Sequence, residues 1–64
     1  MDTIKTAGSW FIDRSFVRCF GIEETFGIYN VVAYLHDGTK AMLKTFYHRK
    51  DAEAYLKVLN GEKQ

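Results

Sequence analysis

Apolar, aromatic and β-branched residues gather in short runs along the first three-quarters of the chain. The clearest run is 28–35, where alternate residues share one face, as in a half-buried strand: Tyr29, Val31, Ala33 and Leu35. Similar runs at 16–22 and 40–46 predict two further strands. A shorter apolar run at 10–12 adds a fourth strand if it pairs on its own.

Asp37-Gly38 separates two of these runs and predicts a tight hairpin. A two-residue loop pairs His36 with Thr39, whereas a three-residue loop with Gly38 in the left-handed conformation pairs Leu35 with Thr39. We favour the three-residue loop, because the other register mixes lysines into the apolar face. The favoured register predicts one face with Val31, Ala33, Leu35, Ala41 and Leu43. It predicts an opposite face with Val32, Tyr34, Lys40, Met42 and Lys44.

The last quarter of the chain has helical periodicity. Apolar residues recur at the spacing of one helix face, at Ala52, Tyr55, Leu56 and Leu59. Asn60-Gly61 is a typical helix end. A helix of about three turns is marginal in water, so we expect its apolar stripe to pack on the sheet.

These elements predict an α+β fold. We expect a three- or four-stranded antiparallel β-meander, followed by one C-terminal helix packed on one sheet face. Residues 1–8 are expected to form a flexible N-terminal arm, 9–61 a single domain and 62–64 a tail. One short helix covers only one side of such a sheet, so the opposite face is expected to be uncovered.

Composition narrows the class of protein. The 64 residues are 47% hydrophobic and carry a net charge of +1, which is typical of a folded chain without a strong bulk field. The single cysteine, Cys19, excludes an internal disulfide. Small cores usually need an additional source of stability, and of the usual sources self-association is the one least excluded here. No apolar run approaches the ~20 residues that span a bilayer, and the start lacks a secretory signal pattern. We therefore expect a cytoplasmic protein.

The uncovered face is the candidate interface. Its predicted members are Val32, Tyr34, Met42, Lys40 and Lys44. Exposed apolar and aromatic residues on a small domain indicate a docking surface, so we expect a non-enzymatic interaction module that forms a homodimer or docks another protein. The alternative is a single-stranded nucleic-acid-binding protein that uses the same face. A cluster of unpaired cations beside Tyr34 in the structure would favour a nucleic-acid partner. Neutralisation of those cations by Glu23 and Glu24 would favour a protein partner.

A basic run marks the predicted helix start. The candidate anion or nucleic-acid contacts are Arg18, His48, Arg49 and Lys50. Free N–H groups at a helix start favour anions, but positive charge there opposes the helix dipole. The alternative interpretation, which we favour, is a set of solvated side chains partly offset by Asp51 and Glu53.

No catalytic, metal-binding or cofactor-binding residue set is expected. Cys19 with His36 or His48 offers a thiol and a base, but a single strand cysteine is more often a small hydrophobic residue. The histidines and cysteine lack the spacing of metal sites, and there is no phosphate-binding glycine motif. We expect neither an enzyme nor a membrane or small-molecule partner.

One resemblance adds to this interpretation. The chain resembles short uncharacterised strand–strand–strand–helix proteins of bacteria and their phages. The matching residues are Tyr29-Asn30-Val31-Val32-Ala33-Tyr34-Leu35, Asp37-Gly38, Leu43-Lys44-Thr45-Phe46, Ala52 and Tyr55-Leu56. The resemblance implies a bacterial or phage origin and a small accessory or regulatory role, but no activity and no residue roles.

Overall fold

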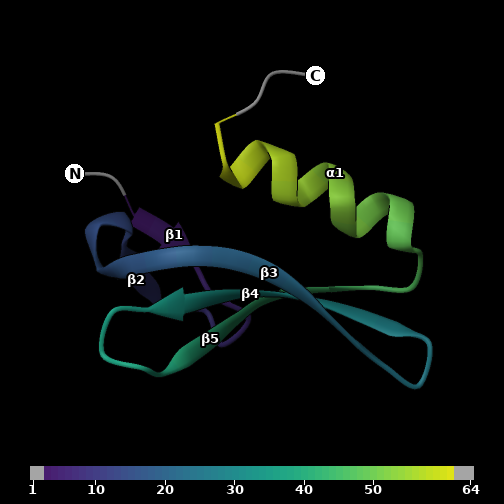
Figure 1. Cartoon of the computed structure of the whole chain (residues 1–64), viewed down its shortest axis with the longest axis horizontal. Helices are drawn as coiled ribbons and strands as arrows, with labels where there is room; N and C mark the ends of the chain where they lie inside the picture. Colours follow the sequence, from purple (N-terminus) through teal and green to yellow (C-terminus); the bar gives the residue numbers. More distant parts are fainter. Residues whose placement is uncertain (1–2, 62–64) are drawn as a thin grey trace.

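A computed structural model describes residues 3–61 (Figure 1). Its elements are, in chain order, β1 (Thr3–Lys5), β2 (Phe11–Asp13), the 3₁₀ turn η1 (Arg14–Phe16), β3 (Val17–Thr25), β4 (Ile28–Leu35), β5 (Lys40–Phe46) and α1 (Arg49–Leu59). The last three strands form an antiparallel sheet in the order β3-β4-β5, and β1 and β2 form a separate two-stranded sheet. The predicted α+β class, with one C-terminal helix on the sheet, is confirmed. Among the described residues, no helix is both long and apolar enough to span a membrane.

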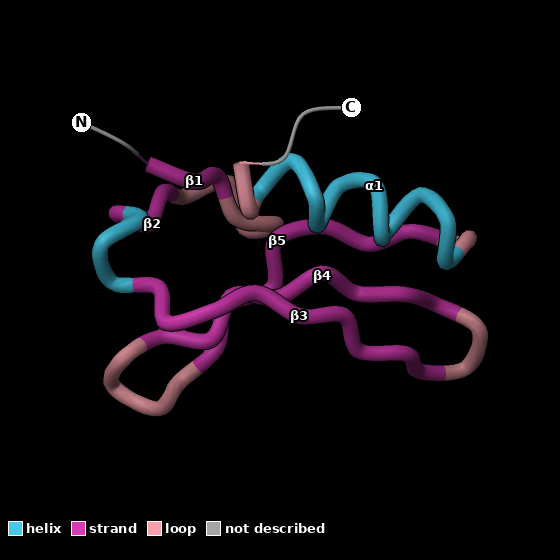
Figure 2. The backbone as a smooth tube through the Cα atoms, turned by 45° about the horizontal axis from the view of Figure 1, so that its top comes forward, coloured by secondary structure: helices cyan, strands magenta, loops and turns pink. Residues whose placement is uncertain are grey.

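The core lies between α1 and one face of the three-stranded sheet (Figures 1 and 2). From the helix, Ala52 and Leu59 are buried, and Leu56 is half-buried beside them. From the sheet, the buried side chains are Val31, Ala33, Ala41 and Leu43. The periodic stripe therefore packs on the sheet, which stabilises a helix too short to persist alone.

The β4–β5 hairpin has the predicted three-residue loop. The Leu35 N–H donates to the Thr39 carbonyl at 2.8 Å, and Gly38 has a φ of +93°. Asp37 closes the loop, because its Oδ1 accepts hydrogen bonds from both the backbone N–H and the hydroxyl of Thr39. Residues Val32 and Tyr34 therefore face Met42 and Lys40 across the two strands, as predicted.

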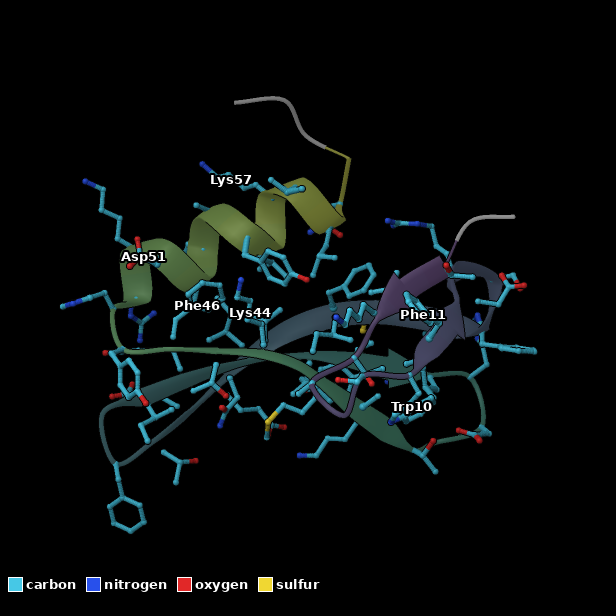
Figure 3. The ribbon with its side chains drawn as sticks, turned by 180° about the vertical axis from the view of Figure 1, so that it is seen from behind. Trp10, Phe11, Lys44, Phe46, Asp51 and Lys57 are labelled. Carbon is cyan, nitrogen blue, oxygen red and sulfur yellow. The ribbon has the colours of Figure 1, made fainter. Side chains whose placement is uncertain are left out.

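A β-bulge in β5 corrects one part of this prediction. Val32 lies opposite Met42, but Val31 lies opposite Lys44, so Leu43 is an extra residue. An extra residue reverses the inward and outward alternation beyond it. The Lys44 ammonium consequently lies on the helix side, 5.6 Å from the ring centre of Phe46 and 5.7 Å from that of Tyr55 (Figure 3). Its predicted place on the uncovered face is wrong.

The N-terminal residues also differ from expectation. Residues 1–8 were expected to form a flexible arm, whereas Thr3–Lys5 pairs with Phe11–Asp13 in an antiparallel hairpin. Ile4 and Ile12 face each other in this pairing, and both are buried in the main core. The Ala7 N–H donates to the Met42 carbonyl and so attaches the hairpin to the edge of β5. The tail expected at 62–64 lies outside the described residues.

Candidate functional site

The face of the sheet opposite α1, called here the outer face, brings four of the predicted interface residues together. Val32 and Tyr34 on β4 lie beside Met42 and Lys40 on β5. Val32 is only 2% exposed although no helix covers it, whereas Met42 is 47% exposed. Neighbouring side chains therefore already shield the centre of this face.

A polar network crosses the outer face. The Tyr34 hydroxyl donates to Glu23 Oε2 at 3.1 Å, and Lys40 Nζ lies 2.6 and 2.8 Å from the two carboxylate oxygens of Glu23. The hydrogen bonds from Lys40 and then Tyr34 lower the pKa of Glu23. The same contacts with Glu23 raise the pKa of Lys40 and of Tyr34. The network keeps Lys40 paired with an anion on this protein.

The remaining basic candidates do not form one patch. Arg18 lies in β3 at the register shift between Val17 and Cys19, near the end of β4 that carries Leu35. Arg49 lies at the opposite end of the sheet, where its guanidinium contacts Glu24 at 3.5 Å and packs over the ring of Tyr29.

The other two basic candidates, His48 and Lys50, flank Arg49 at the start of α1. His48 occupies the N-cap position but makes no side-chain cap hydrogen bond. The structure therefore groups three of the four candidate anion contacts at the helix start and separates Arg18 from them.

A concave surface lies elsewhere, at the N-terminal hairpin end of the sheet. A groove of about 440 Å³ is lined by Trp10, Phe11, Ile12, Asp13, Phe16, Leu35, His36 and Asp37. Trp10, Phe11 and Phe16 are 56%, 61% and 62% exposed, so each presents most of its ring area to solvent. We call this surface the aromatic groove.

The fold fixes both walls of the aromatic groove. One wall is β2 and η1, and the other is the end of β4 with the Asp37-Gly38 loop. The His36 N–H donates to the Phe16 carbonyl at 3.0 Å and joins the two walls. Trp10 lies against the backbone at Gly8, where a Cβ atom would come within 2.9 Å of the indole Nε1. Figure 3 shows Trp10 and Phe11 at this end of the molecule, with Asp51 at the other end.

Two carboxylates give the aromatic groove its charge. Asp13 is the N-cap of η1, and hydrogen bonds from Ser15 lower its pKa. Hydrogen bonds from Thr39, first from the hydroxyl and then from the backbone, lower the pKa of Asp37. Neither lysine nor arginine lines the groove. Both carboxylates are therefore ionised at neutral pH, in a groove whose lining contains His36 but no lysine or arginine.

The groove was not predicted from the sequence. The apolar pattern indicates a strand at 10–12 and the start of another at Phe16, but not that their side chains meet. The available signal was three aromatic residues within seven positions, on either side of a turn at Asp13-Arg14-Ser15. Their exposure depends on how the hairpin packs, which the local pattern does not encode.

The described histidine, cysteine and acidic side chains do not cluster as metal ligands. Within residues 3–61, no group of three or more histidine, cysteine, aspartate or glutamate residues is placed to hold a metal ion. The Cys19 thiol is exposed on β3, and no hydrogen bond joins it to a histidine in this part of the chain. Aromatic rings beside two carboxylates give the aromatic groove an apolar and anionic character.

Comparison of the chain with protein-family models, curated protein sequences and solved structures gave no match. The resemblance to short bacterial and phage proteins therefore stays a prediction. Function has to be inferred from the chain's own side chains.

Proposed function

We propose that this protein is a non-enzymatic interaction module that binds a protein segment in the aromatic groove. The observation that carries the proposal is the exposure of Trp10, Phe11 and Phe16, each above one half, around one concave surface. A domain of 64 residues has few aromatic side chains to spare from its core. Three aromatic side chains exposed together carry an unfavourable hydration free energy, which a partner that covers them would remove.

The chemistry of these side chains supports a protein partner. Aromatic residues supply much of the binding energy at protein interfaces because each buries a large area with little loss of conformational freedom. Concave apolar surfaces with a few polar groups are also the usual form of ligand sites. The His36–Phe16 hydrogen bond holds the walls of the groove in place, which lowers the entropy cost of binding.

The alternative, a single-stranded nucleic-acid-binding protein, has less support. Nucleic-acid binding depends on unpaired cations that replace counterions along the phosphates. Glu23 neutralises Lys40, and Lys44 lies on the helix side of the sheet. The carboxylates of Asp13 and Asp37 would repel phosphates from the aromatic groove. The neutralisation of Lys40 by Glu23, beside Tyr34, is the charge pattern that we expected for a protein partner.

The test is selection of peptides from a random twelve-residue phage-display library on the purified protein. We expect enriched peptides whose binding weakens at least about tenfold in Phe16→Ser, because an aromatic anchor would be lost. Tyr47→Ser is the matched control, since Tyr47 is an exposed aromatic that does not line the groove. Circular dichroism checks that both variants stay folded.

Two outcomes would contradict the proposal. One is a library selection without reproducible enrichment. The other is a set of selected peptides that bind Phe16→Ser and Tyr47→Ser with equal affinity.

A further inference from the structure

We infer that the segment bound in the aromatic groove carries a basic side chain, lysine or arginine, next to an apolar anchor. The inference rests on the proposed function and names the chemistry of the partner. Its basis is the position of Asp13 and Asp37 in the lining of the groove.

Each carboxylate is oriented by hydrogen bonds and is accessible from the groove. The Oδ1 atom of Asp13 accepts from the Ser15 N–H at 2.9 Å, and the Oδ1 atom of Asp37 accepts from Thr39 at 2.9 and 2.6 Å. These bonds orient the side chains by attaching one oxygen to the local backbone. Asp37 is exposed and Asp13 is half-buried, so each carboxylate also remains accessible to a ligand. An oriented and accessible carboxylate is a suitable acceptor for a charged donor.

Within residues 3–61, no lysine or arginine lines the groove beside the two carboxylates. Arg14 follows Asp13 directly, but its guanidinium donates to the Leu59 carbonyl at 2.7 Å and lies over the Phe20 ring. Arg14 is therefore engaged with the helix end and the core-facing side of β3. The lining of the groove contains two anions and neither lysine nor arginine.

The aromatic rings suit the same ligand. A lysine or arginine stem packs its methylene groups on apolar surface while the charged head stays at the rim. The faces of Trp10 and Phe16 also attract a cation, because an aromatic ring carries partial negative charge on its face. An acidic segment would meet like charges at the positions of Asp13 and Asp37, so it is excluded by the same electrostatics.

The test repeats the peptide selection on a charge variant. The double substitution Asp13→Asn, Asp37→Asn removes both charges but keeps an Oδ1 acceptor for Ser15 and Thr39, so the fold should survive. We expect peptides selected on the parent protein to contain lysine or arginine beside an aliphatic or aromatic residue. They should bind the double variant roughly threefold to thirtyfold more weakly, the range for two exposed charge pairs. Their affinity for the parent protein should also fall as sodium chloride is raised.

The matched control is Asp51→Asn. Asp51 is an exposed carboxylate in the first turn of α1, at the other end of the molecule from Trp10 (Figure 3). This variant should bind the selected peptides within about twofold of the parent, because screening removes most of a distant charge.

The outcomes separate this inference from the proposed function. Peptides without basic residues that are sensitive to Phe16→Ser but not to the double variant would overturn the inference and leave the proposed function standing. Peptides insensitive to Phe16→Ser would overturn both. A concentration-dependent dimer that is lost in Phe16→Ser would assign the groove to a second copy and overturn the basic-segment inference.

Discussion

Glu23 on β3 and Lys40 on β5 meet across the central strand β4, with Nζ and Oε2 2.6 Å apart. The Tyr34 hydroxyl joins the same carboxylate from the strand between them. The outer strands of the sheet are thus connected by side chains as well as by the backbone. The connection lies on the same outer face as Val32, which is 2% exposed.

The connection predicts a pH-dependent stability. The pKa of Glu23 lies below its ordinary value of 4.5. Ionised Glu23 therefore stabilises the fold above about pH 4.5, and this stabilisation is lost as the pH falls through the lowered pKa. The pKa of Lys40 is above its ordinary 10.5, so its contribution is present below that value and is lost as the pH rises through the raised one. We expect Glu23→Gln to melt below the parent at pH 7, by a small amount that decreases in high salt. The difference between the two melting temperatures should shrink from pH 6 to pH 3. A constant difference over this range would show that the ion pair does not stabilise the fold.

The conformation of the hairpin loop predicts that substitution of Gly38 lowers the stability of the fold. A Cβ atom there would touch nothing within 4 Å, so the penalty of Gly38→Ala comes only from the backbone, at a φ of +93°. We expect a loss of about 1 kcal/mol or more in the free energy of unfolding, measured with urea. Gly38→Asn should lose less, because asparagine tolerates positive φ better than alanine. Equal stability of the parent and Gly38→Ala would contradict the loop conformation.

The helix stripe predicts a large effect at Leu59. This side chain is buried in the core, whereas Leu56 is half-buried. We expect Leu59→Ala to lose roughly 2–5 kcal/mol, which is comparable to the whole stability of a domain of this size. Leu56→Ala should lose less. Thermal melting followed at 222 nm distinguishes the two, and a reversed order would show that the helix is rotated relative to the sheet.

The N-terminal hairpin predicts a core role for Ile4. A flexible arm would tolerate any change at this position, but Ile4 is buried against the main core. We expect Ile4→Ala to lose roughly 2–5 kcal/mol. Lys5→Ala, on the exposed neighbour, should be close to neutral. If both variants unfold at the same urea concentration as the parent, the hairpin does not contribute to the core.

The sequence predicted those parts of the fold that local patterns encode. Asp37-Gly38 indicated the turn and its register, and the spacing of Ala52, Leu56 and Leu59 indicated the helix and its buried face. The strand at Thr3–Lys5 was missed because one apolar residue between two polar residues is too short a pattern to detect.

Two further features depend on tertiary structure. The bulge at Leu43 was missed because Ala41, Met42 and Leu43 are all apolar, so the local pattern does not show where the alternation of faces changes. The aromatic groove was missed because the exposure of Trp10 and Phe16 is decided by where the N-terminal hairpin packs. Four of the five candidate interface residues share the outer face, while self-association through that face stays a prediction.

The extra residue at Leu43 also limits how the chain length can vary. Deleting Leu43 would leave a regular ladder in which Lys44, Thr45 and Phe46 keep their partners on β4 and their present faces. The core would nevertheless lose the side chain of Leu43, which is buried at 4% exposure. An insertion in the Phe26-Gly27 turn would instead change only an exposed loop. Related chains, where they exist, should therefore differ in length at the turns and keep the same spacing between Met42 and α1.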